Sequence, residues 1–172
     1  MKKSAKILKV TLLLFFLTEA FGLNTAYAQN SKQQKENNKE DAVKKMVESQ
    51  QYVFVAQSAL PMGGRIRQLT SAYELKVTKD TLEADLPYYG RAYTAPIDPT
   101  QGGFHFKTKN FEYRAKETKK GGWDISITPK DVTDVRQLTL NISKAGYTSL
   151  QVTSNSRQPI SFNGYIIEPD KK

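Results

Sequence analysis

From Tyr52 onward, apolar and polar residues alternate with a period of two, and this pattern constrains the fold more than any other feature of the chain. Such a period places alternate side chains on opposite faces of a β-strand, so each alternating run has one face suited to a core. Residues 52–57 are instead apolar almost throughout, which suits a strand buried on both sides. Aromatic and β-branched residues, which favour strands, fill most of the apolar positions. The runs cover residues 52–57, 73–78, 104–107, 111–114, 123–128, 138–143, 147–153 and 160–167.

Short turns rich in glycine separate these runs. They lie at Pro61–Gly64, Gln101–Gly103, Lys119–Gly122 and Ala145–Gly146. Turns of this kind join antiparallel strands, whereas parallel strands need crossover helices, and no window after Tyr52 is long and helical enough to supply one. The sequence therefore predicts an all-β fold, an antiparallel sandwich or flattened barrel of roughly eight to nine strands.

A different pattern precedes the strands. Val43, Met46 and Val47 recur at helical spacing after Asp41, a residue suited to a helix N-terminus. They predict a short N-terminal helix of about three turns, which must pack on the β domain because it is too short to be stable alone. Residues 29–40 are rich in Gln, Asn, Lys and Glu, which predicts a flexible leader. The single β domain with its helix is then expected over residues 41–172.

The first 28 residues have the organisation of a secretory signal peptide. Residues 1–9 carry four lysines, residues 10–17 contain none, and Ala26-Tyr27-Ala28 supplies small residues at the −3 and −1 positions. A membrane-spanning helix would need about 20 apolar residues, and Thr18 and Glu19 interrupt this stretch. We expect cleavage at this site, a periplasmic or secreted mature protein, and no transmembrane segment after cleavage. With no Cys in the chain, lipoprotein anchoring is not expected.

Composition narrows the expected partners. The chain has a formal net charge of +9, but its basic residues are scattered and not interleaved with aromatics in one run. This distribution argues against nucleic acid as a partner. Without Cys, stability must come from burial in one core, which a domain of this length can supply. We expect a monomer whose partner is an unknown glycan, peptide or envelope protein.

Several segments of the chain resemble the domain-of-unknown-function family 4251 of Bacteroidetes. The segments, in order, are Tyr52–Pro61, Leu86–Tyr93, Gly121–Trp123 and Gln158–Gly164. The resemblance extends from about residue 44 to the C-terminus. It implies an exported protein, and it brings no assigned reaction, ligand or catalytic residue.

The chain lacks the residues that most catalytic and metal sites require. The chain has one His and no Cys, so a Ser-His-Asp triad must use His105, which lies between Phe104 and Phe106 on a predicted strand without a nucleophile elbow. The same count is too low for an ordinary zinc site, and neither a calcium loop nor a phosphate-binding loop is present. We therefore predict no metal, no cofactor and no enzymatic activity.

Carboxylates remain available for a glycosidase, which needs only two facing acids. Two acids flank one loop and three others cluster near a hairpin end. These residues are Asp85, Asp98, Asp124, Asp131 and Asp134. A carboxylate-type glycan hydrolase is thus an alternative function, although capping turns and facing solvent is the usual role of such acids.

The loop over Leu86–Asp98 is the best candidate site, with Tyr88, Tyr89, Arg91 and Tyr93 as ligand-binding residues. Aromatic rings beside an Arg often form sugar and peptide sites. In the alternative interpretation, the tyrosines plug one end of the fold and Arg91 caps their carbonyls. Thr81, in Asp80-Thr81-Leu82, matches a short acceptor pattern for bacterial O-glycosylation.

These observations together predict an exported, non-catalytic envelope or secreted binding protein. Besides the hydrolase, a second alternative is a structural or assembly component that binds another envelope protein through a surface strand or an apolar patch.

Overall fold

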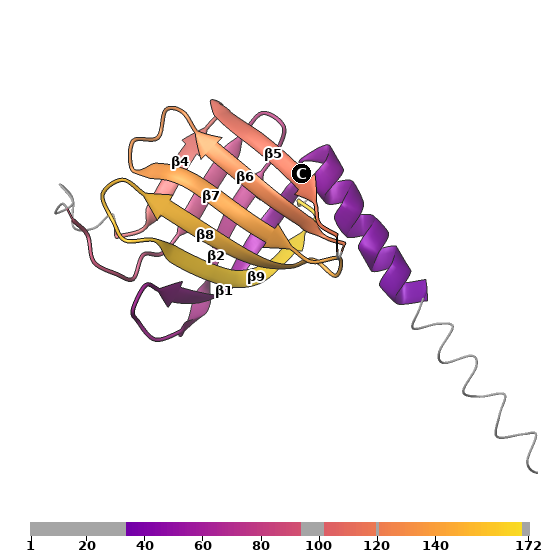
Figure 1. The fold of residues 1–172 in the computed structure, drawn as a ribbon, viewed down its shortest axis with the longest axis horizontal. Helices are drawn as coiled ribbons and strands as arrows, with labels where there is room; N and C mark the ends of the chain where they lie inside the picture. The colour runs from indigo at the N-terminus through magenta and orange to yellow at the C-terminus, as the bar shows by residue number, and fades with distance from the viewer. Residues whose placement is uncertain (1–33, 94–101, 120, 170–172) are drawn as a thin grey trace, which may run out of the picture. The chain divides into compact units, whose positions relative to one another are not determined.

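Figure 1 shows a computed structural model of the chain, which describes residues 34–93, 102–119 and 121–169. The predicted signal peptide, residues 29–33 of the predicted leader, and Asp98 lie outside the described residues. Residues 39–169 belong to one compact unit, and residues 34–38 are the described part of another. No helix within the described ranges combines the length and apolarity needed to cross a membrane.

The N-terminal helix covers residues 34–49 and is longer than predicted. Residues 34–40, which were expected to be a flexible leader, are helical. Lys, Gln and Glu have high helix propensity, a contribution that the argument from low hydrophobicity left out. Val43, Met46 and Val47 are buried on one face, as their spacing predicted. The helix ends at Gln50, whose left-handed φ of 54° turns the chain toward the first strand.

Nine strands follow, and they confirm the prediction of an antiparallel β fold. They are β1 (Tyr52–Pro61), β2 (Arg67–Val77), β3 (Leu82–Leu86), β4 (Phe104–Thr108), β5 (Phe111–Glu117), β6 (Trp123–Pro129), β7 (Val135–Ile142), β8 (Tyr147–Ser154) and β9 (Ile160–Ile167). Eight of them overlap the predicted runs, although β2 begins six residues and β7 three residues before its run. The ninth, β3, was missed because Glu, Ala and Asp, which strands disfavour, occupy its middle.

The strands form one barrel-like sheet that is nearly closed, in the order β4-β3-β2-β1-β9-β8-β7-β6-β5. Each strand is antiparallel to its neighbours, so β4 and β5, at the two edges, have the same sense within the sheet. Closing the gap would require parallel pairing, and the two residues between these strands, Lys109 and Asn110, are too few for a parallel crossover. The sheet therefore keeps two edges.

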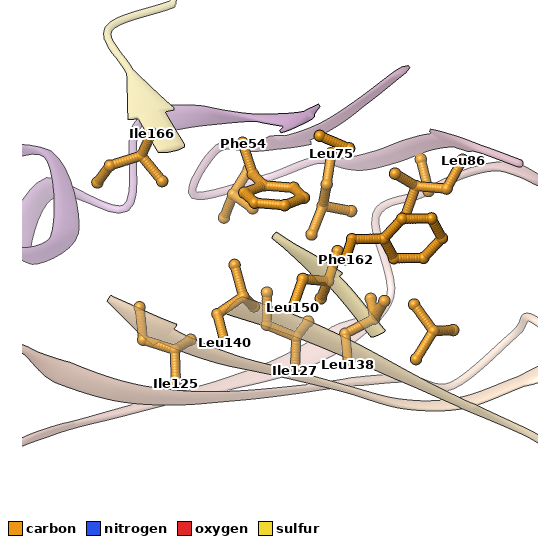
Figure 2. Packing of buried hydrophobic residues seen from close by; sticks show 14 of the residues in the cluster. Phe54, Leu75, Leu86, Ile125, Ile127, Leu138, Leu140, Leu150, Phe162 and Ile166 are labelled. Carbon is orange, nitrogen blue, oxygen red and sulfur yellow. The ribbon is translucent and has the colours of Figure 1, made fainter. Parts of the chain in front are cut away.

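The core fills the inside of this sheet. Figure 2 shows Phe54 of β1 and Leu75 of β2 facing side chains of β6, β7 and β8. Among these are Ile127 and Leu138, which have no exposed surface. Full burial of one such side chain stabilises the fold by about 2 kcal/mol before entropy is counted. The alternation seen in the sequence thus holds the strands in register and fixes where their connecting loops meet.

Candidate functional site

The described part of the chain contains a groove of ≈780 Å³ formed by three connecting segments. Its lining comes from the β1–β2 turn Pro61–Gly64, from Arg65 and Arg67, from Tyr89–Arg91 after β3, and from Gln158 before β9. We call it the arginine groove.

Strand pairing brings these segments together. The end of β1 pairs with the start of β9 through Pro61 and Ile160, which places the turn beside the segment that precedes β9. An isolated antiparallel bridge between Ala92 and Arg157 then joins the segment after β3 to the same region. Residues distant in the sequence therefore line one groove because of register.

Positive charge dominates the arginine groove. Arg65, Arg67 and Arg91 line it, and none of the described residues of its lining is Asp or Glu. None of these arginines forms a salt bridge within the described residues, whereas Arg114 and Arg157 each pair with an acid. Arg67 lies over the ring of Tyr89, with its guanidinium carbon 4.9 Å from the ring centroid. A guanidinium held by a ring face keeps its N–H edges available to donate to an anion.

One side of the groove, which we call the fixed wall, consists of residues 88–93 and 156–158 and is held by several hydrogen bonds. The hydroxyl of Tyr88 lies 2.8 Å from the carbonyl oxygen of Arg91, to which it donates, and 3.2 Å from that of Gln158. The Gln158 N–H also donates to the Arg91 carbonyl, and the Tyr93 N–H donates to the Ser156 carbonyl. The backbone of Arg91 is thus anchored on both sides.

A charged pair supports the fixed wall. Arg157, whose side chain is 13% exposed, lies 3.2 Å from a carboxylate oxygen of Asp134. Its guanidinium also donates to the Gly103 carbonyl and lies 5.2 Å from the ring centroids of both Tyr88 and Phe104. In addition, Asp134 accepts hydrogen bonds from two serine hydroxyls, Ser154 and Ser156. The Asp134 carboxylate thus ties the β6–β7 loop to residues 154–157, and Arg157 extends the link to Gly103 before β4.

The opposite side, the hairpin wall, consists of residues 61–67 and has few such contacts. The Gly64 N–H donates to the Pro61 carbonyl, and Gly63 has a φ of 74° that a side chain would strain. Met62 is 66% exposed and Ile66 is 57% exposed. Of these two exposed apolar side chains, Met62 belongs to the groove lining, and Ile66 lies outside it, between Arg65 and Arg67 in the sequence.

The structure divides the four predicted ligand-binding residues. Tyr89 and Arg91 line the arginine groove, and their binding of a ligand stays a prediction. Tyr88 has a structural position, since it packs edge-on against Phe104 with the ring centroids 5.6 Å apart, and burial raises the pKa of its hydroxyl. Tyr93 is 68% exposed and does not belong to the lining. The plug interpretation thus describes Tyr88, and the binding interpretation describes the geometry of Tyr89 and Arg91.

The candidate carboxylates have separate partners. Asp85 lies 2.7 Å from the Nδ1 atom of His105, while Asp124 accepts a hydrogen bond of 2.6 Å from Asn141. Asp131 accepts from the hydroxyl of Thr108. Within the described ranges, no three His, Asp or Glu side chains gather in a way that could hold a metal ion.

Thr81 lies in the turn between β2 and β3. Its N–H donates to the hydroxyl of Thr78, and its carbonyl accepts from both the N–H and the hydroxyl of Thr78. The backbone of the suggested glycosylation acceptor is therefore part of a hydrogen-bonded turn.

Arg65, Arg67 and Gln158 were missed as site residues by the sequence analysis. Arg65 and Arg67 follow the glycine pair at the β1–β2 turn with Ile66 between them, a basic and apolar mixture that could have drawn attention to this turn. Their approach to Arg91 depends on the register of β1, β2 and β9, which no local pattern contains.

Comparison with known proteins supports the fold and identifies the family. No curated protein matches the chain. A crystal structure of a DUF4251 family protein from Bacteroides eggerthii DSM 20697 is 14% identical and has a TM-score of 0.58, and the match covers 76% of this chain and 87% of that one. This similarity shows a shared fold. The sequence model of the domain of unknown function DUF4251 matches residues 34–166, and the chain therefore belongs to the DUF4251 family.

Proposed function

We propose that this protein is an exported, non-catalytic binding module whose arginine groove takes an anionic ligand through a carboxylate or phosphate group. The observation that carries the proposal is the presence of Arg65, Arg67 and Arg91 in one groove, with no acid among the lining residues that the structure describes. Like charges gathered in a concave surface raise the local concentration of counter-ions and gain most when an anion binds between them.

The geometry fits recognition of such a group. Arg91 stands on the anchored backbone of the fixed wall, so little of its main-chain freedom is lost on binding. Arg67 is oriented by the ring of Tyr89. Guanidinium groups can bind carboxylate or phosphate oxygens with two parallel hydrogen bonds, which fixes the direction of the ligand as well as its charge. The amide of Gln158 adds one neutral donor and acceptor.

The lining also supports a binding role in preference to a catalytic one. Among the described residues, its side chains belong to Pro, Met, Arg, Tyr and Gln, and it includes no Ser, His, Asp or Glu. General acid–base and nucleophilic catalysis usually rely on those latter residues. Arginine, which stays protonated, is suited to hold an anion and poorly suited to move a proton.

Export rests on the signal-like organisation of residues 1–28. Intact-mass measurement of the protein expressed in a Bacteroides host tests it, with cleavage after Ala28 as the expected result. A mass that retains the first 28 residues in the cell lysate would remove export from the proposal.

Isothermal titration calorimetry with tripolyphosphate and with trigalacturonate tests the binding function. We expect saturable binding of at least one of these anions by the wild-type protein and affinity at least ten-fold weaker in Arg67→Gln/Arg91→Gln. Arg114→Gln is the matched control, because Arg114 is exposed on β5 and paired with Glu112. Absence of binding to both anions, or an equal loss in the control, would contradict the proposed function.

A further inference from the structure

We infer that the arginine groove docks on an anionic lipid bilayer, with the lipid headgroups held by its arginines and the apolar side chains of the hairpin wall placed among the lipids. This inference rests on the proposed anion-binding function and names the surface that carries the anion. It begins from apolar exposure, a feature that the charge of the groove does not explain.

Exposed large hydrophobic residues are concentrated at the β1–β2 hairpin. Of the six such side chains among the described residues, three lie within residues 60–66: Leu60 at 40%, Met62 at 66% and Ile66 at 57% exposure. Single exposed apolar side chains are ordinary, but a cluster of them at one hairpin marks an interaction surface. Met and Ile are large enough to displace considerable water when they enter an apolar phase.

The charged residues near this cluster in the sequence are all positive. Residues 55–73 contain no Asp or Glu, and Arg65 and Arg67 alternate with Ile66. Arg91 adds a third cation from the fixed wall. A soluble anion would satisfy the arginines and leave Met62 and Ile66 in water. An anionic bilayer satisfies both, because its headgroups carry the charge and its acyl region accepts the apolar side chains.

The electrostatic and the apolar contributions to bilayer affinity are each modest, so both are needed for binding. A basic side chain near an anionic surface contributes about five-fold in affinity, and long arginine side chains can reach the headgroups while their stems remain in apolar surroundings. The Met and Ile side chains that enter the bilayer supply the rest of the affinity. Binding of this kind is reversible, depends on anionic lipid and weakens as salt increases.

Vesicle co-sedimentation of the full mature chain tests the inference, with phosphatidylglycerol and phosphatidylcholine vesicles in equal parts compared with pure phosphatidylcholine. We expect binding to the anionic vesicles and at least ten-fold weaker binding to the neutral ones. Leu60→Ser/Ile66→Ser, at two exposed positions of the hairpin outside the groove lining, should bind the anionic vesicles at least ten-fold more weakly while keeping its affinity for tripolyphosphate or trigalacturonate. Ile167→Ser is the control, because Ile167 is also 40% exposed but lies at the far end of β9.

The outcomes separate the two proposals. Soluble-anion binding without vesicle binding overturns the bilayer inference and leaves the proposed function intact. Vesicle binding that L60S/I66S retains, or that I167S loses equally, also overturns the inference. Failure to bind both soluble anions and vesicles contradicts both proposals.

Discussion

The two walls of the arginine groove are built in opposite ways. In the fixed wall, the Tyr88 hydroxyl ties the segment after β3 to the segment before β9, and the Arg157–Asp134 pair ties the latter segment to the β6–β7 loop. In the hairpin wall, one hydrogen bond closes the turn, and Met62 and Ile66 face solvent. Polar groups of the fixed wall therefore have partners within the protein, whereas those of the hairpin wall remain available to a ligand.

This difference separates residues that maintain the site from residues that meet a ligand. A side chain whose donors and acceptors are already used adds to stability, whereas an exposed side chain without a partner adds little stability and can serve binding. The fixed wall should therefore be sensitive to substitution in unfolding experiments. The hairpin wall should be sensitive in binding experiments.

The largest expected effect comes from removing Asp134, the acid that supports the fixed wall through Arg157. Asp134→Ala leaves the 13% exposed side chain of Arg157 without its carboxylate partner. We expect a loss of about 2–3 kcal/mol in the free energy of unfolding, below the range for a fully buried pair because solvent screens part of the interaction. Urea denaturation measures it. Asp124→Ala, which removes an exposed acid bonded to Asn141, should cost less than about 1 kcal/mol. Equal losses of unfolding free energy in the two variants would contradict the special role of Asp134 in supporting the fixed wall.

Tyr88→Phe should have an intermediate effect on the fixed wall. The hydroxyl lies within hydrogen-bond distance of the Arg91 and Gln158 carbonyls, so its removal should cost about 1 kcal/mol in unfolding free energy. Looser anchoring of Arg91 should also weaken tripolyphosphate binding a few-fold. A variant with unchanged stability and unchanged binding would show that this hydroxyl does not hold the wall.

The same residue predicts a pH dependence. Burial raises the pKa of Tyr88 above 10.0, its value in an unfolded chain, so below pH 10 the residue is protonated in both states. Above pH 10 the unfolded chain loses this proton first, and stability falls as pH rises through the folded pKa. Urea denaturation at pH 9 and pH 11 should show a smaller fall for Tyr88→Phe than for the wild type. Identical falls would contradict this assignment.

Arg67→Gln should affect the hairpin wall mainly in binding. Loss of its contact with the Tyr89 ring should change the unfolding free energy by about 0.5 kcal/mol, the scale of an exposed cation–π contact. Tripolyphosphate affinity should fall about ten-fold by calorimetry. The comparison fails if stability falls by several kcal/mol while affinity is kept.

The smallest stability effect is expected for Met62→Ser. Because Met62 is 66% exposed, its replacement should leave the unfolding free energy within about 0.5 kcal/mol of the wild type in urea denaturation. A larger loss would mean that this side chain supports the hairpin and is not held available for a partner.

Local pattern predicted most of the fold and only part of the site. Alternation located the runs that became β1, β2 and β4 to β9 because burial on one face acts over neighbouring residues. It missed β3, whose polar middle is tolerated because β2 and β4 flank it in the sheet. The prediction also began the helix too late, because it left out residues 34–40, where helix propensity outweighs low hydrophobicity.

The site depends on contacts across long sequence separations. Tyr89 and Arg91 were predicted from their own loop, but their partners were not, since Arg67 reaches Tyr89 only through the pairing of β1, β2 and β9. Asp134 was considered as one of several acids, and only the fold brings it to Arg157. Composition reveals what a site can contain, and register decides which residues meet there.

The most direct test of the arginine groove is NMR observation of the arginine side-chain Nε–H signals during titration with tripolyphosphate. We predict saturable shifts for Arg65, Arg67 and Arg91, with no change at Arg114 or at Arg136, an exposed residue of β7 outside the groove lining. Shifts of equal size at all five arginines, or none at the three in the groove, would contradict the account.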